Sequence, residues 1–473
     1  MYRLPLALCS DDGAPLYEQL YSSILGQIRA GELPAGTRLP GKRSLSQQLS
    51  VGVNTVDTAY QMLVAEGYLE ARPRSGFFVL ETAEAVTPGA AAAVAIPEEV
   101  SPPPCRFDLS TGSVDTELFP FRTWGRIQKE LLYDAPELLS HGPRQGERAL
   151  RQAVGEYLAT YRGVVCSPEQ IVVGAGTEYL LGLVARLLQG QTAAVENPGY
   201  QRLSTILQNN GVACRFVDID SAGLSLEALE QSGAELCCVT PSHHFPTAVT
   251  MPAGRRSQLL RWARERPGRY IIEDDYDAEF RFDTRPLPSL QGMGGQLGPV
   301  IYLSTFSKSL APSIRVACMV LPPELLERYR ETYGSYANTV SRFEQQTLYR
   351  FMEGGYFTRH LSRMRSAYKA RMERLCEALG AALGPENIHL QGRHTGLHLL
   401  LTLKTGLSEE EMVRRAGEAG VGLQGLSAYY MEHRSTCPAS TVILGYAALR
   451  DADILPLADV LREAWQRREG GSR

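Results

Sequence analysis

Apolar residues in the first part of the chain recur at every fourth position, as they do along one face of an α-helix. The clearest series ends before Gly31, a residue type that often terminates helices, and consists of Leu16, Leu20, Ile24 and Ile28. Shorter series predict a second helix over 44–49 and a third over 55–66. Asn54 precedes the third helix and belongs to the residue types that cap helix N-termini.

Two strand-like segments follow these helices. Residues 68–72 and 77–79 are rich in aromatic and apolar side chains, and the turn formers Pro73 and Gly76 separate them. This arrangement is typical of a β-hairpin. Three helices and a hairpin within residues 1–80 predict a winged helix-turn-helix domain.

The next segment, residues 81–106, has a different composition. Alanine predominates from residue 85 to residue 94, and Pro102, Pro103 and Pro104 close the segment. Such a stretch cannot bury enough apolar surface to fold, and a proline run favours an extended backbone. We expect a linker between two domains.

From residue 107 to residue 473, short apolar runs alternate with helical segments, a pattern typical of a parallel α/β sheet. A long helical stretch begins near Pro322, and the runs 396–401 and 441–444 predict a smaller α+β subdomain at the C-terminus. The strand candidates of the larger part are residues 170–173, 192–195, 236–239, 270–272 and 300–303.

Composition and charge set limits rather than indicating a function. The 473 residues are 44% hydrophobic and 21% charged, with a formal net charge of −4, and the first 80 residues carry seven basic and seven acidic side chains. DNA binding would therefore depend on where the basic residues lie. None of the nine cysteines forms a CxxC pair, so we expect no metal site. With no signal-like or membrane-length apolar run, we expect a cytoplasmic protein without membrane contact.

The strongest candidate for chemistry is Lys308. It follows the apolar run 300–303 and lies among small hydroxyl residues, and Arg315 follows seven positions later. A primary amine can form a Schiff base with an aldehyde, while hydroxyls and a guanidinium can bind a phosphate. This combination indicates a site for pyridoxal 5′-phosphate (PLP).

Two upstream segments favour the same cofactor. A glycine-rich turn at 173–178 follows a strand and opens a helix, where backbone N–H groups can bind an anion. Asp274 and Tyr276 follow the strand 270–272, at the edge of a parallel sheet where ligand sites lie. A carboxylate there can keep the pyridine nitrogen protonated, and a phenol can hydrogen-bond the 3′-oxygen of the ring.

Basic and short polar side chains occur where a winged helix meets DNA. One basic cluster lies at the start of the second helix and another in the wing, positions suited to phosphate contacts. Short polar residues at the start of the third helix can reach bases or backbone. The candidates for DNA binding are Arg38, Lys42, Arg43, Asn54, Thr55, Thr58, Arg72 and Arg74.

These motifs carry a resemblance to a known family. Residues 107–473 resemble fold-type I aminotransferases, and the whole chain resembles the MocR/GabR branch of GntR-type transcription regulators. The resemblance covers nearly the full length. Its segments are 174–177, 196–200, 240–247, 270–280 and 305–315, with 15–17, 36–40, 43–45, 54–56 and 66–68 in the first domain.

The resemblance implies a role for each residue of the cofactor site. It makes Lys308 the Schiff-base lysine, Asp274 the partner of the pyridine nitrogen and Tyr276 that of the 3′-oxygen. Tyr200 would lie against the ring. His243, with its neighbour His244, would lie beside the cofactor, and an ordinary loop position is the alternative for both. The phosphate would be held by Gly176, Thr177, Ser307 and Arg315.

Several positions depart from the family pattern. Amino-acid-sensing members carry an arginine for the carboxylate of the effector where this chain has Ala448, whereas Arg202 matches the second arginine of such sites. Arg450 is a candidate replacement, two residues along. Ala248 replaces a usual glycine, and Val53 stands where an arginine usually precedes the asparagine of the recognition helix.

Two functions are consistent with these motifs. The first is a PLP-dependent transcription regulator that binds a double-stranded DNA operator and senses either PLP itself or an amino compound. The second is an active aminotransferase with an accessory winged-helix domain, and a residual half-reaction with amino acids is compatible with the regulator too. The helix-turn-helix favours the regulator. Ala448 favours PLP as the effector, as in family members that regulate vitamin B6 synthesis. The resemblance also implies a domain-swapped homodimer.

Overall fold

The computed structural model describes residues 14–81, 105–283, 287–404, 406–433 and 436–466. The chain divides into two units, residues 1–102 and 103–473. The predicted linker, residues 81–106, lies outside the described residues except at its ends. Within the described ranges, no helix combines the length and the apolar character that a membrane span requires.

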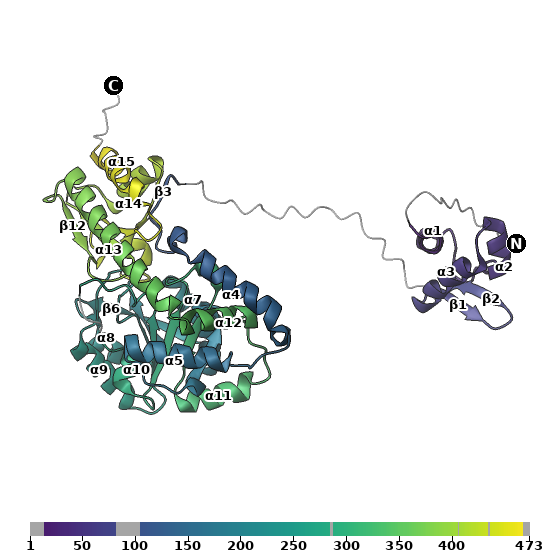
Figure 1. Cartoon of the computed structure of the whole chain (residues 1–473), viewed down its shortest axis with the longest axis horizontal. Coiled ribbons are helices and arrows are strands. Elements are labelled where there is room, and N and C mark those ends of the chain that lie inside the picture. Colours follow the sequence, from purple (N-terminus) through teal and green to yellow (C-terminus); the bar gives the residue numbers. More distant parts are fainter. Residues whose placement is uncertain (1–13, 82–104, 284–286, 405, 434–435, 467–473) are drawn as a thin grey trace, which may run out of the picture. The chain divides into compact units, whose positions relative to one another are not determined.

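The first unit contains the elements of a winged helix-turn-helix (Figure 1). Helices α1 (Leu16–Arg29), α2 (Lys42–Leu49) and α3 (Val53–Ala65) precede an antiparallel hairpin of β1 (Leu69–Arg72) and β2 (Gly76–Val79). Their apolar faces meet because each helix carries its buried residues on one side. The core includes Leu20, Ile24, Leu45, Val56, Tyr60, Leu63 and Phe77.

The start of α3 differs from the prediction. The amides of Thr55 and Val56 donate to the carbonyl of Gly52 at 3.1 and 3.4 Å, so the helix begins at Val53. Gly52 has extended backbone angles and is the N-cap, without a side-chain cap bond. The prediction that Asn54 caps this helix is therefore wrong. Asn54 lies exposed in the first turn.

An eight-stranded, mostly parallel sheet forms the centre of the second unit. Its strands are β4 (Ile171–Gly174), β5 (Thr192–Asn197), β6 (Ala213–Asp220), β7 (Gly223–Leu224), β8 (Leu236–Val239), β9 (Tyr270–Asp275), β10 (Val300–Thr305) and β11 (Ala317–Val320). They lie in the order β4-β11-β10-β9-β8-β5-β6-β7. All five predicted strands are present, and the predicted α/β class is confirmed.

Strand β11 positions the site, although the sequence pattern did not predict it. It runs antiparallel to both of its neighbours, β10 and β4. The register pairs Thr305 with Ala317 and Ala317 with Gly174. The lysine segment and the glycine-rich turn, some 130 residues apart in the chain, therefore begin at the same edge of the sheet.

Helices cover both faces of the sheet because successive strand residues point to opposite faces. Val172 packs with α6, α7 and α11, whereas Ile171 and Val173 pack with α4, α5 and α12. A further cluster joins β5, β8 and β9 to α8, α9 and α10. The helices are α4 (Phe121–Asp134), α5 (Arg148–Arg162), α6 (Thr177–Leu187), α7 (Gln201–Asn209), α8 (Leu226–Ser232), α9 (Ala253–Arg264), α10 (Leu290–Gly294), α11 (Pro323–Tyr333) and α12 (Arg342–Glu353).

The long helix α13 (Tyr356–Leu383) leads into a smaller C-terminal part (Figure 1). This part has the predicted α+β character, with a four-stranded antiparallel sheet in the order β12-β13-β16-β15. β3 (Phe107–Asp108) pairs with β14 (Val421–Gly422) and ties the start of the unit to this part. The other elements are β12 (Ile388–Gln391), β13 (His398–Leu403), α14 (Glu409–Glu418), β15 (Gln424–Gly425), β16 (Thr441–Gly445) and α15 (Ile454–Gln466).

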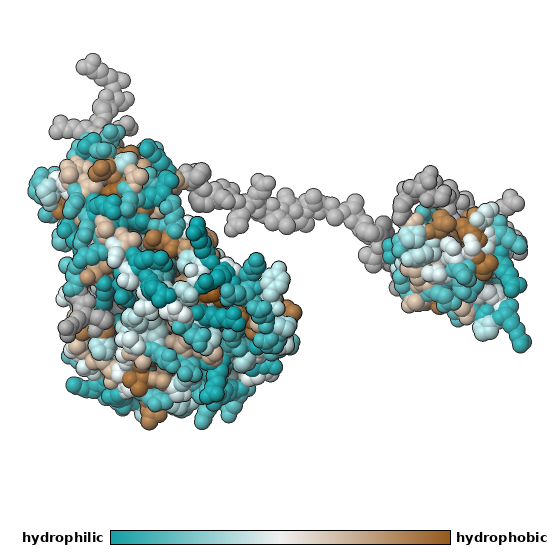
Figure 2. Space-filling model, in the orientation of Figure 1, coloured by the Kyte–Doolittle hydropathy of each residue, from teal (hydrophilic) through white to brown (hydrophobic). Residues whose placement is uncertain are grey.

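Some large apolar side chains remain on the surface of the second unit. Figure 2 shows hydrophobic residues scattered over the face in view. The exposed set includes four residues on α4 and on the short 3-10 helix Pro136–Leu139 that follows it. These four are Phe121, Leu132, Tyr133 and Leu139. Several exposed apolar side chains on consecutive elements are a feature of protein contact surfaces.

Candidate functional site

A cavity of about 270 Å³ lies where β9 and β10 end and α6 begins. It is lined by residues from segments that are far apart in the chain. Those singled out from the sequence are Thr177, Tyr200, Arg202, Asp274, Tyr276, Ser307, Lys308 and Arg315. The carboxyl ends of the parallel strands thus converge on one cavity, which is where ligands bind in open α/β sheets.

Lys308 extends from the segment after β10 toward the start of the unit. Its Nζ donates to the carbonyl oxygens of Thr111 and Gly112 at 2.6 and 3.1 Å. Burial lowers the pKa of Lys308, and attraction to Asp277 opposes that shift. A lower pKa increases the fraction of neutral amine, which is the nucleophilic form. Thr111 and Gly112 were not predicted from the sequence, because they belong to a polar loop some 200 residues upstream.

Asp274, at the end of β9, presents a carboxylate without a partner. Its Oδ1 is buried and has no hydrogen-bond partner among the residues that the structure describes. Burial, with repulsion from Asp275 and Asp277, raises the pKa of Asp274 to about 7. A cationic N–H donor in the cavity would satisfy this oxygen and return the pKa toward its ordinary value.

The neighbouring Asp275 points away from Asp274 into a buried ion pair. Arg162 of α5 approaches Asp275 with Nε to Oδ2 at 2.6 Å, and the Tyr302 hydroxyl donates to the same oxygen at 2.7 Å. Burial raises the pKa of Asp275, but attraction to Arg162 outweighs it and holds the pKa below its ordinary value. This pair fixes the end of β9, and Arg162 was not recognised from the sequence.

The hydroxyl of Tyr276 forms a hydrogen bond with a buried histidine. The hydroxyl oxygen lies 3.1 Å from Nδ1 of His243, which is 2.8 Å from Oδ2 of Asp277. His243 is buried and does not itself line the cavity. Its ring packs against Gly396, where any side chain would collide with the imidazole. His398 of β13, which the sequence did not single out, lines the cavity with its ring centroid 4.5 Å from that of His243.

Glycine and arginine fit together at the opposite end of the cavity. A Cβ at Gly176 would lie 2.5 Å from Nη2 of Arg315, and Gly176 has a φ of +93°. Arg315 donates from Nη2 to the carbonyl of Ala175 at 3.1 Å. The Thr305 hydroxyl donates to that of Ser307 at 2.9 Å. Because Thr177 begins α6, backbone N–H groups, hydroxyls and a guanidinium meet here, a set suited to a phosphate group.

The structure shows where the residues that bear on the departures from the family pattern lie. Arg202 is mostly exposed, and its Nη1 lies 3.2 Å from Oε1 of Glu178. Arg450 is 71% exposed, pairs with Asp453 at 2.8 Å and does not line the cavity, so it does not replace the arginine absent at Ala448. Ala248 has a φ of +58°, a conformation that favours glycine.

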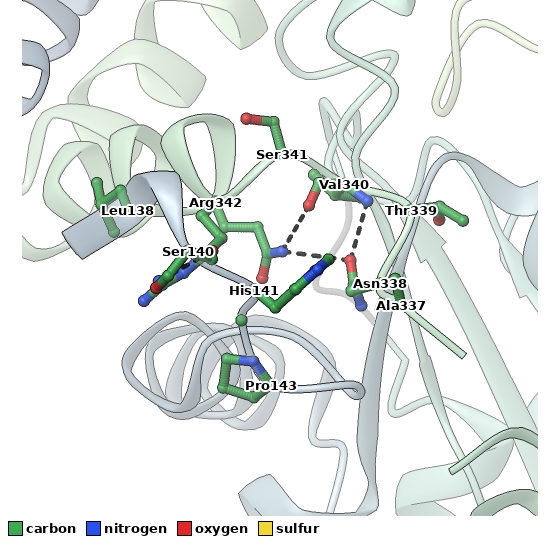
Figure 3. Close-up of a pocket in the computed structure, with 12 residues that line it drawn as sticks. Leu138, Ser140, His141, Pro143, Ala337, Asn338, Thr339, Val340, Ser341 and Arg342 are labelled. Carbon is green, nitrogen blue, oxygen red and sulfur yellow. Dashed lines mark hydrogen bonds between the residues drawn. The ribbon is translucent and has the colours of Figure 1, made fainter. Parts of the chain in front are cut away.

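A second cavity, of about 340 Å³, lies between the segment 138–143 and the segment 337–342 (Figure 3). Some of its polar groups form hydrogen bonds with one another. The side-chain amide of Gln345 donates to Val340 at 2.9 Å and to Asn338 at 3.2 Å. Thr339, also in its wall, accepts from the amide of Ala175 at 3.1 Å. The bond to Thr339 thus supports the glycine-rich turn. This turn adjoins Thr177, Ser307 and Arg315, which we call the phosphate-type end of the first cavity.

The first unit carries its candidate residues on the surface. Asn54 and Thr58 line a shallow depression along the exposed side of α3. Lys42 pairs with Asp57, and Arg72 pairs with Glu70 at 2.7 Å. Arg74 lies at the hairpin turn with a φ of +61°. The other candidates, Arg38, Arg43 and Thr55, are exposed or partly exposed.

Two families match the two units. Residues 16–79 match the family "Bacterial regulatory proteins, gntR family", and residues 106–441 match "Aminotransferase class I and II". Among solved structures, the kynurenine aminotransferase of Pyrococcus horikoshii superposes with a TM-score of 0.66 at 26% identity. That comparison covers 76% of this chain and 90% of the enzyme.

Relatives along nearly the whole chain are regulators. The uncharacterized HTH-type transcriptional regulator YhdI of Bacillus subtilis is 39% identical, over 95% of this chain and 96% of its own. The probable rhizopine catabolism regulatory protein MocR of Rhizobium meliloti is 34% identical, over 97% and 96%. The HTH-type pyridoxine biosynthesis transcriptional regulator PdxR of Corynebacterium glutamicum is 31% identical, over 90% and 91%.

The chain belongs to the GntR-type transcription regulators that carry a class I and II aminotransferase domain, the MocR type. It is a DNA-binding regulator, and the cofactor of its second unit is PLP. The cavity fits that cofactor. Asp274 Oδ1 is an acceptor without a partner, Gly176 leaves the room that Arg315 needs, and Lys308 presents an amine.

Proposed function

We propose that this regulator binds PLP in the cavity of its second unit and responds to PLP itself, controlling genes of vitamin B6 synthesis. The observation on which the proposal rests is that the cavity has groups to bind PLP but no further group to bind the carboxylate of an amino acid. A phosphate-type end, an amine and an acceptor for the ring nitrogen are all present. A further free guanidinium for the carboxylate of an amino acid is not found among the described residues of the cavity, because Arg202 is paired with Glu178 and Arg450 does not line the cavity.

The sequence-predicted residues receive roles on this proposal. Lys308 binds the cofactor covalently, Asp274 accepts from its ring nitrogen, and Tyr276 donates to its 3′-oxygen. Tyr200 packs on the ring, and His243 keeps the Tyr276 hydroxyl in place through the bond at 3.1 Å. When bound, PLP supplies an aldehyde carbon that amines can attack. The phosphate is held by Gly176, Thr177, Ser307 and Arg315.

The DNA-binding roles follow from exposure and pairing. Arg38, Arg43 and Arg74 are exposed without a carboxylate partner in the ion pairs of the described residues, and they contact phosphates. Lys42 and Arg72 contribute less, because each already has a carboxylate partner. The polar side chains of α3 that enter the groove are Asn54, Thr55 and Thr58.

The assembly we propose is a domain-swapped homodimer in the cytoplasm. The exposed apolar side chains of α4 and the following turn support a contact between copies. Two copies of the first unit would also match two half-sites on an operator. An amino compound is the second candidate effector, because amines attack the aldehyde carbon that PLP supplies.

The proposal is tested by the absorption spectrum of the full-length protein mixed with PLP. We expect a visible band in the wild type that Lys308→Ala lacks, and no change of that band when amino acids are added. A band that one amine shifts or bleaches would favour the amino-compound effector. If the wild type shows no band, Lys308 does not bind PLP and the proposal fails.

A further inference from the structure

The phosphate-type end of the cavity already has an acidic side chain in its wall. Glu178, the second residue of α6, lies between two arginines that also line the cavity. Its Oε1 is 3.2 Å from Nη1 of Arg202, and its Oε2 is 3.9 Å from Nη2 of Arg315. One carboxylate therefore engages Arg315 of this end and the neighbouring Arg202.

The position of Glu178 follows from the local sequence. Gly176 is the N-cap of α6. Because it has no side chain, the guanidinium of Arg315 can lie beside the first turn of this helix. An acidic residue in a first helical turn is favourable, because the unpaired N–H groups there carry partial positive charge. Those same N–H groups and Arg315 make up the end of the cavity assigned above to phosphate. Glu178 thus occupies a setting that attracts anions.

The carboxylates of this cavity have different partners. Asp274 lies at the strand ends with an unpartnered oxygen, and Asp277 bonds to His243 at 2.8 Å. Glu178 instead pairs with arginines, and its side chain is 42% exposed. A phosphate monoester that enters here must share Arg315 with Glu178 and meets a like charge.

We propose that Glu178 determines the phosphate affinity of the cavity. It acts as an internal competitor that weakens the binding of phosphate monoesters and keeps PLP exchangeable. The inference rests on the proposed function, because it concerns the affinity of the same site for PLP. A sensor responds best when its dissociation constant lies near the concentration of its ligand, so weakened binding suits a regulator that reads PLP levels.

The test compares Glu178→Gln with the wild type in the full-length protein. Removing the charge should tighten binding of PLP, followed by the visible band, by about three- to tenfold. Inorganic phosphate, followed by calorimetry, should gain affinity in the same direction. Glu178→Asp keeps the charge and should stay close to wild type. Glu410→Gln, an exposed change of equal charge on α14, should alter neither affinity.

The outcomes separate this inference from the function on which it rests. If neither the wild type nor Glu178→Gln forms the visible band with PLP, the proposed function fails. If the band forms and Glu178→Gln binds PLP no more tightly, the inference is wrong and the function stands. A gain for PLP without a gain for inorganic phosphate would also overturn it. Should Glu178→Gln fail to fold, as judged by its thermal unfolding, Glu178→Ala serves as the second uncharged variant.

Discussion

The two binding regions of this protein place their charges in opposite settings. The first unit carries exposed arginines on the surface of a winged helix. Its core is made of other, apolar residues, such as Leu20 and Val56. The second unit instead contains a buried ion pair, in which Arg162 of α5 holds Asp275 at the end of β9. In the first unit, contact residues can change without loss of the fold. In the second, the residues of the site and those of the scaffold belong to one network.

The largest expected effect breaks that buried network. Arg162→Ala leaves the carboxylate of Asp275 buried without a cationic partner, since the 2.6 Å pair is lost. We expect the free energy of unfolding of the second unit to fall by about 3–5 kcal/mol, measured in urea. The matched control is Arg450→Ala, whose pair with Asp453 is exposed and worth at most about 1 kcal/mol. Equal losses in both variants would refute the contrast.

A core substitution in the first unit should separate the two regions. Leu20→Ala removes a fully buried side chain, and we expect a loss of about 2–5 kcal/mol in that unit alone. DNA binding should weaken at physiological temperature, while the visible band with PLP is unchanged. Leu455→Ala, at an exposed position of α15, is the control. A loss of the PLP band in Leu20→Ala would show that the units do not fold independently.

The pH dependence of stability gives a third contrast. The pKa of Asp274 is raised to about 7 from an ordinary 3.8, so the unfolded chain loses this proton first. Its contribution to the stability of the cofactor-free protein is present at low pH and is lost as pH rises toward 7. Asp274→Asn should therefore stabilise that protein by about 1–3 kcal/mol near pH 8 and little near pH 4.

The same substitution should weaken PLP binding, because an amide cannot hold the ring nitrogen protonated. Unfolding curves at the two pH values and a PLP titration measure both effects. Stabilisation that is independent of pH would mean that Asp274 is already ionised in the cofactor-free protein. An Asp274→Asn variant that binds PLP as well as wild type would remove Asp274 from the site.

The smallest effects belong to the exposed arginines. Arg43→Ala should weaken DNA binding uniformly across sequences and reduce the slope of log affinity against log salt by about 1. Arg72→Ala should reduce it less, since Glu70 already neutralises Arg72 at 2.7 Å. Fluorescence anisotropy at several salt concentrations measures both. A larger slope change for Arg72→Ala would reverse the assignment.

Elements with regular apolar patterns were predictable from the sequence. The helices of the first unit and strands β4, β5, β8, β9 and β10 follow directly from such patterns. Strand β6 alternates exposed and half-buried residues, so it lacks a continuous apolar run. Strand β11 directly follows the Arg315 loop. It was not predicted, because the segment before it was interpreted only as a cofactor-binding motif. At α3, Asn54 is a good capping residue, yet the helix starts earlier because Gly52 accepts the first bonds.

The residues of the site that sequence motifs identified are those nearest the cavity, such as Lys308 and Asp274. The ones that support them come from distant segments and carry no local signal. Arg162 reaches Asp275 across 113 positions, and Thr111 reaches Lys308 across 197. The pairing of Arg202 with Glu178 was also not predictable, because either residue alone is typical of a helix surface.

The most direct test of the account measures whether PLP changes DNA affinity through Lys308. A duplex selected by the full-length protein from random sequences would be titrated by anisotropy, with and without PLP. We expect PLP to change the affinity of the wild type by about fivefold or more and to leave that of Lys308→Ala unchanged. An equal response in both proteins, or none in the wild type while its PLP band forms, would contradict the claim that the cavity controls the DNA-binding unit.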